Sequence, residues 1–291
     1  MPFLRQIGGR KMMRKEVLKE PTYVEELLEI FRSGLGKEEL LNKLSDYHES
    51  DIADALEEMS VEERKKIYPV LGAEYVAEIF SYIEDATQYL QEIHIEKAAK
   101  VISEMDADDA VDILENMDED IRKKIVELLD EDASEDVKLI LSYEEDEIGS
   151  EMTTNFIAIN KGLNIRQATH ELIKQAGDND NITTIYVVDE KNHYYGAIDL
   201  KDLIIAREYQ DLNDLISTSY PYVNAHEKIS ECIERLKDYA EDSIPVLSDS
   251  GEILGVITAY DVVEAVDEEM GDDYAKLAGL TAEEDLKETT L

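Results

Sequence analysis

The sequence predicts an α + α/β protein in three parts. A superhelix of short stacked helices comes first, a duplicated β-α-β-β-α unit follows, and an acidic connecting helix comes last. Three observations predict this order: a long stretch with helical periodicity only, a repeat that keeps its register over many residues, and a strongly acidic final stretch.

The helical part extends from Thr22 to about Ser142, where apolar residues recur at helical spacing and almost no strand pattern occurs. A loose repeat places large apolar residues on one stripe and an acid on its flank. Polar connectors such as Ser60–Glu63 and Asp118–Asp120 are typical of helix N-caps followed by acids in the first turn. Short helices with one buried stripe each predict a stacked superhelix. The repeat occurs in Ile52–Met59, Val76–Ile83 and Ala110–Met117.

A duplication begins at Met152. The segment Ile185–Leu203 aligns with Ile244–Val262 without a gap, at a spacing of 59 residues. Upstream the spacing becomes 64, because the polar loop Gly177–Asn181 adds five residues to the first copy. The first copy predicts strands at Phe156–Ile159, Ile185–Val188 and Tyr194–Ile198, and helices at Ile165–Ile173 and from Asp202 onward.

Composition excludes several classes of protein. Asp and Glu number 70 against 29 Lys and Arg, for a net charge of −41, so phosphates are repelled and broad nucleic-acid binding is excluded. A single cysteine excludes an internal disulfide framework. No run of about 18 apolar residues occurs, so the sequence predicts no segment that spans a bilayer. The sequence has no Gly-rich phosphate loop, no nucleophile paired with a base and no zinc pattern, which predicts that it is not an enzyme.

The duplicated unit resembles the CBS module. Its closing strand ends in Gly–aliphatic–aliphatic–Thr–x–x–Asp, here Gly255–Asp261. The resemblance implies a pseudo-twofold pair that forms a homodimer, and ATP or another adenine nucleotide as a ligand, with Thr258 and Asp261 as the ribose contact. Because the first copy has Asp199 in place of the Thr, only the second copy is predicted to bind nucleotide. A helix N-cap at Asp261 is the open alternative.

An acidic helical domain before two CBS units narrows the resemblance. Tyr143–Gly149, followed by Met152 and Thr153, resembles the junction of MgtE-type magnesium transporters. In that family a transmembrane pore follows a plug helix, and the resemblance implies that the pore is missing from this chain. The implied domains are a basic tail at 1–21, the helical N domain at 22–148, CBS units at 149–209 and 210–266, the start of the plug helix at 264–280, and a tail at 281–291.

The same resemblance implies several weak Mg²⁺ sites between the helical domain, the CBS pair and the plug helix. Asp108 and Asp112 are four residues apart and share one helix face, while Asp261 and Glu264 are three apart at a helix start. Mg²⁺ prefers oxygen ligands, and no His or Cys cluster competes. The implied metal ligands are Glu78, Asp108, Asp112, Asp261, Glu264, Glu269, Asp272 and Asp273.

The predicted function is magnesium sensing on the cytoplasmic side of the cell membrane. Mg²⁺ between acidic surfaces is expected to hold the missing pore shut, and acid repulsion at low Mg²⁺ is expected to let it open. Two alternatives stay open. One is an adenine-nucleotide-sensing CBS module of another channel or enzyme. The other is an acidic helical adaptor for a basic protein.

Overall fold

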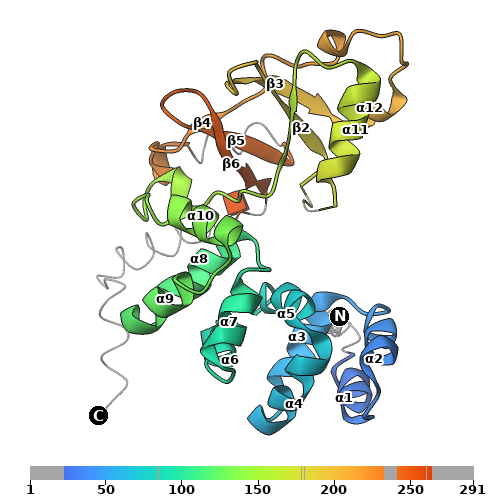
Figure 1. The fold of residues 1–291 in the computed structure, drawn as a ribbon, viewed down its shortest axis with the longest axis vertical. Coiled ribbons are helices and arrows are strands. Elements are labelled where there is room, and N and C mark those ends of the chain that lie inside the picture. The colour runs from blue at the N-terminus through green and yellow to red at the C-terminus, as the bar shows by residue number, and fades with distance from the viewer. Residues whose placement is uncertain are drawn as a thin grey trace, which may run out of the picture. The chain divides into compact units, whose positions relative to one another are not determined.

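The computed structural model describes residues 23–83, 85–177, 179, 181–232, 241–259 and 261–263 (Figure 1). The chain divides into two compact units, 1–72 and 73–291, and the division falls inside the helical region. The predicted connecting helix at 264–280 and the two predicted tails lie outside the described residues.

The first unit is helical. Its helices pack in alternation, α1 on α3 and α2 on α4, and bury apolar residues such as Leu27, Leu40 and Leu56. Ser60 and Glu63 form the predicted cap of α4 as a reciprocal capping box, and Gly72 ends that helix at a φ of 96°, which favours glycine. The helices are α1 (Val24–Arg32), α2 (Lys37–Leu44), α3 (Glu49–Glu57) and α4 (Val61–Leu71).

The helical region continues in the second unit with the same kind of packing. In three pairs a helix packs on the next but one: α5 on α7, α7 on α9, and α8 on α10. Asp118 caps α9 by accepting a hydrogen bond from the backbone of Asp120, as predicted. The helices are α5 (Ala73–Phe80), α6 (Thr87–Leu90), α7 (Ile95–Ile102), α8 (Ala107–Glu115), α9 (Glu119–Val126) and α10 (Glu131–Ile140), followed by the 3₁₀ turn η1 (Ile148–Ser150).

Two small mixed sheets follow, which confirms the duplicated β-α-β-β-α prediction. In each sheet the middle strand pairs in parallel with the first strand and antiparallel with the third. The first repeat comprises β1 (Ile157–Asn160), α11 (Ile165–Gln175), β2 (Thr184–Val188), β3 (Tyr194–Asp199) and α12 (Leu200–Ile205). The second comprises η2 (Leu212–Asp214), β4 (Val223–Asn224), β5 (Ser243–Leu247) and β6 (Ile253–Thr258).

The strand registers reproduce both spacings found in the sequence. Thr184 pairs with Asp199 in the first sheet, and Ser243 pairs with Thr258 in the second, 59 residues later on both strands. Val223 of β4 occupies the place of Ile159 of β1, which is the spacing of 64. The polar loop at 177–181 therefore lengthens one repeat without changing its sheet.

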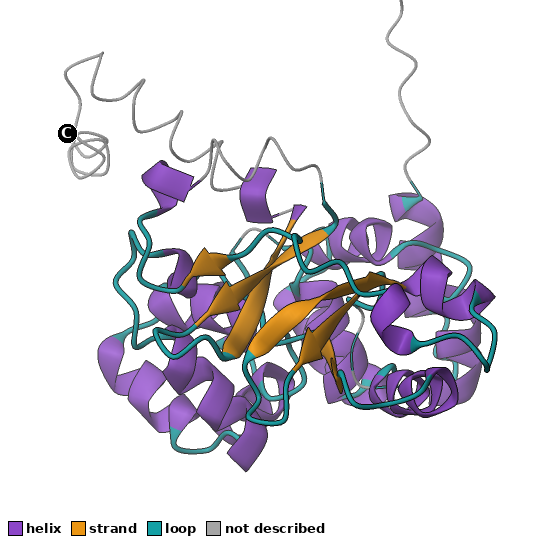
Figure 2. Ribbon diagram, turned by 90° about the horizontal axis from the view of Figure 1, so that it is seen from above, coloured by secondary structure: helices purple, strands orange, loops and turns teal. Residues whose placement is uncertain are grey.

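The two sheets lie side by side (Figure 2). A layer of mostly aromatic side chains packs between them. Tyr186 on β2 is fully buried, and its hydroxyl lies 2.7 Å from the Ser243 hydroxyl of the other sheet. Ile185 and Val187, the neighbours of Tyr186 on β2, belong to a separate apolar core that includes residues of α11. The strand β2 is consequently buried on both faces and joins the two repeats.

Candidate functional site

The segment 152–155 connects the helical region to the second repeat. Thr153 forms an isolated antiparallel bridge with Val256 of β6, and each backbone amide donates to the other carbonyl at 2.9 Å. This strand-like contact is possible because residue 255 is glycine. A Cβ at Gly255 would lie 2.6 Å from the Thr153 carbonyl oxygen, closer than atoms can pack. Gly196 stands in the same relation to Ser217 in the first repeat.

Three consecutive side chains of this segment donate to carboxylates of the helical region. The Thr153 hydroxyl bonds to Asp108 on α8, and the Thr154 hydroxyl donates to Asp136 on α10 at 3.0 Å. The Asn155 amide donates to Asp106, the N-cap residue of α8, also at 3.0 Å. The segment therefore binds acidic residues at α8 and α10 through its side chains, while its backbone pairs with β6.

Asp108 is the most perturbed carboxyl of this group. Its Oδ1 atom is buried and has no hydrogen-bond partner among the described residues. Burial, which is the largest cause, and the nearby charges of Asp109, Asp261 and Asp106 together raise the pKa of Asp108 from 3.8 to about 8, while the Thr153 hydroxyl opposes the shift. The ionised form of a carboxyl at this position is unfavourable, so the group either keeps its proton or needs a cation beside it.

Asp261 approaches Asp108 from the end of β6, where it also takes part in a helix cap. The Thr258 amide donates to the Asp261 carboxylate at 2.7 Å, and the Asp261 amide lies 3.3 Å from the Thr258 hydroxyl. This pair has the reciprocal pattern of a capping box, in which Thr258 has the N-cap position and Asp261 the position three residues later, whereas the alternative expected from the sequence placed the N-cap at Asp261 itself. In the first repeat Asp199 takes the place of Thr258 and caps α12 by accepting from the Lys201 amide at 2.7 Å.

The other predicted ligands divide into two groups. Glu78 on α5 and Asp112 on α8 are exposed, and neither is among the strongest electrostatic influences on Asp108. Asp112 does lie one helical turn from Asp108 on α8, as predicted. The remaining predicted ligands, Glu264, Glu269, Asp272 and Asp273, lie outside the described residues.

Of the residues that act on Asp108, sequence reasoning identified Asp261 and missed the others. Asp106 and Asp109 were indistinguishable from the other acids of the chain, and Thr153, Thr154 and Asn155 were not identified as donors. Three neutral hydrogen-bonding residues in a row, directly before a predicted strand of an acidic chain, were the available signal.

A cleft lies at the corresponding end of the first repeat. It has a volume of about 160 Å³ and contains no basic side chain in its lining. Asp199 and Asp202, the counterparts of Thr258 and Asp261 in the duplication, both line it. The lining residues are Thr183, Thr184, Ala197, Asp199, Asp202, Leu215, Ser217, Tyr220, Glu241 and Asp242.

The oxygen atoms around Asp108 suit a hard cation such as Mg²⁺, which takes oxygen ligands and keeps several of its waters. Within the described part of the chain, no three His, Cys, Asp or Glu side chains stand close enough together to hold a metal ion directly. Contact through water is the mode that fits this spacing. None of the described helices combines the length and the apolar character needed to cross a membrane.

Comparison with known families matches both regions of the chain. The MgtE intracellular N domain matches residues 47–146, and the CBS domain matches residues 146–209 and 212–268. The magnesium transporter MgtE of Enterococcus faecalis is 37% identical over 250 residues, which cover 84% of this chain and 54% of that protein. MgtE of Thermus thermophilus is 30% identical over 145 residues, or 50% of this chain and 32% of that protein.

Two solved structures share the fold over most of their length. The soluble part of a magnesium transporter has a TM-score of 0.80 at 27% identity and covers 84% of this chain and 97% of its own. The cytosolic domain of the Mg²⁺ channel MgtE in complex with ATP has a TM-score of 0.73 at 27% identity and covers 83% and 99%.

The chain thus spans about half the length of the first curated relative. The family consists of transporters and not of enzymes, in agreement with the sequence prediction. An MgtE intracellular N domain followed by a CBS pair shows that this chain belongs to the MgtE family and is homologous to its soluble cytosolic part.

Proposed function

We propose that this chain is the magnesium-sensing region that regulates gating in a magnesium transporter or channel. In this proposal Mg²⁺ bridges acidic surfaces of the helical region, the CBS pair and the plug helix, and the pore closes. One observation carries the proposal: Asp108 has a buried oxygen without a hydrogen-bond partner and lies beside three further carboxylates.

Charge repulsion explains why the domains should separate without Mg²⁺ and close with it. Two carboxylates about 4 Å apart repel by roughly 4 kcal/mol at an effective dielectric near 20. When Asp106, Asp108 and Asp109 of the helical region are ionised, they therefore oppose the approach of Asp261. A divalent cation among these groups reverses the sign of the interaction, and domain closure becomes coupled to cytosolic Mg²⁺.

Several weak sites give a steeper response than one tight site. Moving a two-state equilibrium from 1:99 to 99:1 takes about 5.5 kcal/mol of differential binding. Four sites, each with a tenfold preference for the closed state, supply roughly 1.4 kcal/mol apiece and reach that figure. The Asp108 group is one such site in this proposal. Asp112, Glu78 and the acids at 264, 269, 272 and 273 are candidates for the others.

The partners in this proposal follow from the family. The chain works on the cytoplasmic side of the cell membrane, joined to a transmembrane pore domain, and dimerises through its CBS pair. Homology to the cytosolic part of MgtE supports the cytoplasmic placement and the link to a pore domain. The CBS pair is the basis of the proposed dimer.

Solution X-ray scattering of the chain in chelator and in millimolar MgCl₂ at equal ionic strength tests the proposal. The radius of gyration is expected to fall with Mg²⁺. In Asp108→Ala the midpoint should move to higher Mg²⁺, because one of the sites that favour closure is weakened.

Asp120→Asn supplies the matched control, because it removes one carboxylate from an exposed position in the first turn of α9. Its midpoint should equal that of the unmodified chain. Equal radii of gyration in chelator and in Mg²⁺ for the unmodified chain would rule out the sensing proposal. An Asp108→Ala midpoint equal to the control would rule out Asp108 as a contributor.

Adenine-nucleotide binding is the second candidate, and it is supported by the relative solved in complex with ATP. The second repeat offers Thr258 and Asp261, which would have to open their mutual cap to bind a ribose. Calorimetry with ATP tests this. Binding that is lost in Asp261→Ala supports nucleotide sensing at this cap, and no binding by the unmodified chain contradicts it.

A further inference from the structure

The acidic run Glu144–Glu147 pairs with the segment 225–229 of the second repeat, about 80 residues later in the chain. The Ile148 amide donates to the Glu227 carbonyl at 2.8 Å, and the Gly149 amide donates to the Ala225 carbonyl at 2.9 Å. The Ile229 amide donates to the Asp146 carbonyl at 3.0 Å. These three backbone bonds join the end of the helical region to the start of the second repeat.

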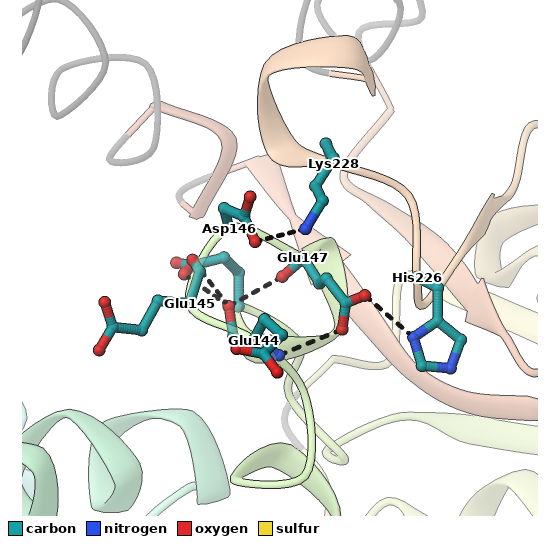
Figure 3. A network of polar contacts seen from close by, with 8 residues as sticks. Glu144, Glu145, Asp146, Glu147, His226 and Lys228 are labelled. Carbon is teal, nitrogen blue, oxygen red and sulfur yellow. Dashed lines mark hydrogen bonds and ion pairs between the residues drawn. The ribbon is translucent and has the colours of Figure 1, made fainter.

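Two side chains of the second repeat face the acids of this run (Figure 3). The ammonium of Lys228 lies 2.5 Å from Asp146 Oδ1. His226 Nδ1 lies 3.2 Å from Glu147 Oε1, and the His226 ring lies 5.2 Å from that of Tyr143.

One ammonium here acts on three carboxylates. The hydrogen bond with Asp146 raises the pKa of Lys228, and the charges of Asp146, Glu147 and Glu144 raise it further. Both members of the close pair keep substantial solvent contact, since the Lys228 side chain is 42% exposed and the Asp146 side chain 70%. The ammonium consequently occupies the position that a dissolved cation would take among these carboxylates.

We propose that Lys228 is an internal counterion that holds the junction between the helical region and the second repeat closed without Mg²⁺. This inference is independent of magnesium sensing at Asp108. It assigns to Lys228 a positioning role: the lysine keeps residues 146–149 fixed to the second repeat in the absence of divalent cations. Acid repulsion can then act at α8 without separating this junction.

Amide hydrogen exchange followed by NMR tests the proposal on the whole chain. The Ile148, Gly149 and Ile229 amides report directly on the junction. In the unmodified chain their exchange should be equal in chelator and in millimolar Mg²⁺. In Lys228→Gln, exchange in chelator should become about fivefold faster, near the upper end for an exposed ion pair. Millimolar Mg²⁺ should restore slow exchange in this variant, because the cation replaces the missing ammonium.

Two controls isolate the charge. Lys228→Arg keeps the charge and should retain slow exchange in chelator. Lys191→Gln removes a lysine from the exposed turn between β2 and β3 and should change none of the three amides. Unchanged exchange in Lys228→Gln would overturn the proposal, and so would faster exchange that Mg²⁺ fails to restore. Magnesium sensing at Asp108 is tested separately, by the scattering experiment.

Discussion

Two acidic surfaces in this chain differ in how their charge is balanced. At the junction Glu144–Glu147, Lys228 supplies an ammonium and His226 a second contact, and the acids remain partly exposed. Around Asp108, the strongest electrostatic influences are three further carboxylates, and one oxygen is buried without a partner. In our two proposals, the contact at Lys228 between the helical region and the CBS pair stays closed without Mg²⁺, while the contact at Asp108 depends on Mg²⁺.

The largest expected effect comes from neutralising Asp108. In chelator at pH 7, the closed arrangement carries the cost of a carboxyl whose pKa rises from 3.8 to about 8, and each pKa unit corresponds to about 1.4 kcal/mol. Asp108→Asn should therefore stabilise the chain in chelator by up to roughly 4 kcal/mol, measured by urea denaturation. Added Mg²⁺ should narrow the difference from the unmodified chain. If Asp108→Asn is no more stable than the unmodified chain, the charge at Asp108 is not unbalanced, and the two acidic surfaces do not differ in this respect.

The pH dependence follows from the same carboxyl. In the folded chain Asp108 keeps its proton up to about pH 8, whereas the unfolded chain releases it near pH 3.8. The folded state therefore binds more protons in this window, and stability in chelator should decrease as pH rises from about 4 to about 8. Subtracting the curve of Asp108→Asn isolates this contribution from those of other acids. A difference curve that is flat between pH 4 and 8 contradicts the assignment.

Part of this site could be predicted from sequence and part could not. The spacings of 59 and 64 gave the strand registers, because a duplication keeps its pairing partners in both copies. Asp108 and Asp261 were predicted as ligands from the family resemblance, and the structure brings their charges together. Spacing alone could not select them among 70 acids, because burial depends on which helix the segment 153–155 contacts.

Glu78 and Asp112 show that helical periodicity does not predict what the side chain of an acid contacts. Their positions on helices are as expected, but both side chains are exposed. An acid on the flank of a buried stripe can face solvent or another domain, and the helical periodicity is the same in both cases. The contact with Thr153, which distinguishes Asp108, lies 45 residues away in the sequence and leaves no trace in that periodicity.

A smaller effect is expected from breaking the backbone pairing that brings Asp261 to Asp108. Gly255→Ala places a Cβ 2.6 Å from the Thr153 carbonyl and should destabilise the chain by about 1–3 kcal/mol in denaturation experiments. Gly177→Ala is the matched control, because nothing lies within 4 Å of its added Cβ. Equal stabilities of the two variants would mean that the bridge between Thr153 and Val256 does not form.

Removing one donor should have a lesser effect. Thr153→Val keeps the shape of a buried side chain and deletes the hydroxyl that opposes the pKa shift of Asp108. The cost should be about 1 kcal/mol, and the pKa of Asp108 should rise further. Thr154→Val, which deletes the donor to Asp136 instead, should leave the Asp108 titration unchanged. If both variants shift that titration equally, Thr153 has no specific role.

The smallest effect concerns the exposed junction. Because Lys228 and Asp146 are largely in contact with water, 1 M monovalent salt should screen their pairing. The difference in amide exchange between Lys228→Gln and the unmodified chain should then disappear. A difference that persists at high salt would mean that Lys228 acts through packing and not through charge.

Carbon-detected NMR titration of the Asp108 carboxyl, assigned by comparison with Asp108→Asn, tests the central claim most directly. In chelator the carboxyl should titrate with a pKa above 7, and millimolar Mg²⁺ should lower that value because the cation stabilises the ionised form. A pKa near 4 in chelator, or a titration that Mg²⁺ leaves unchanged, would contradict the claim that a cation stabilises the ionised form of a buried Asp108.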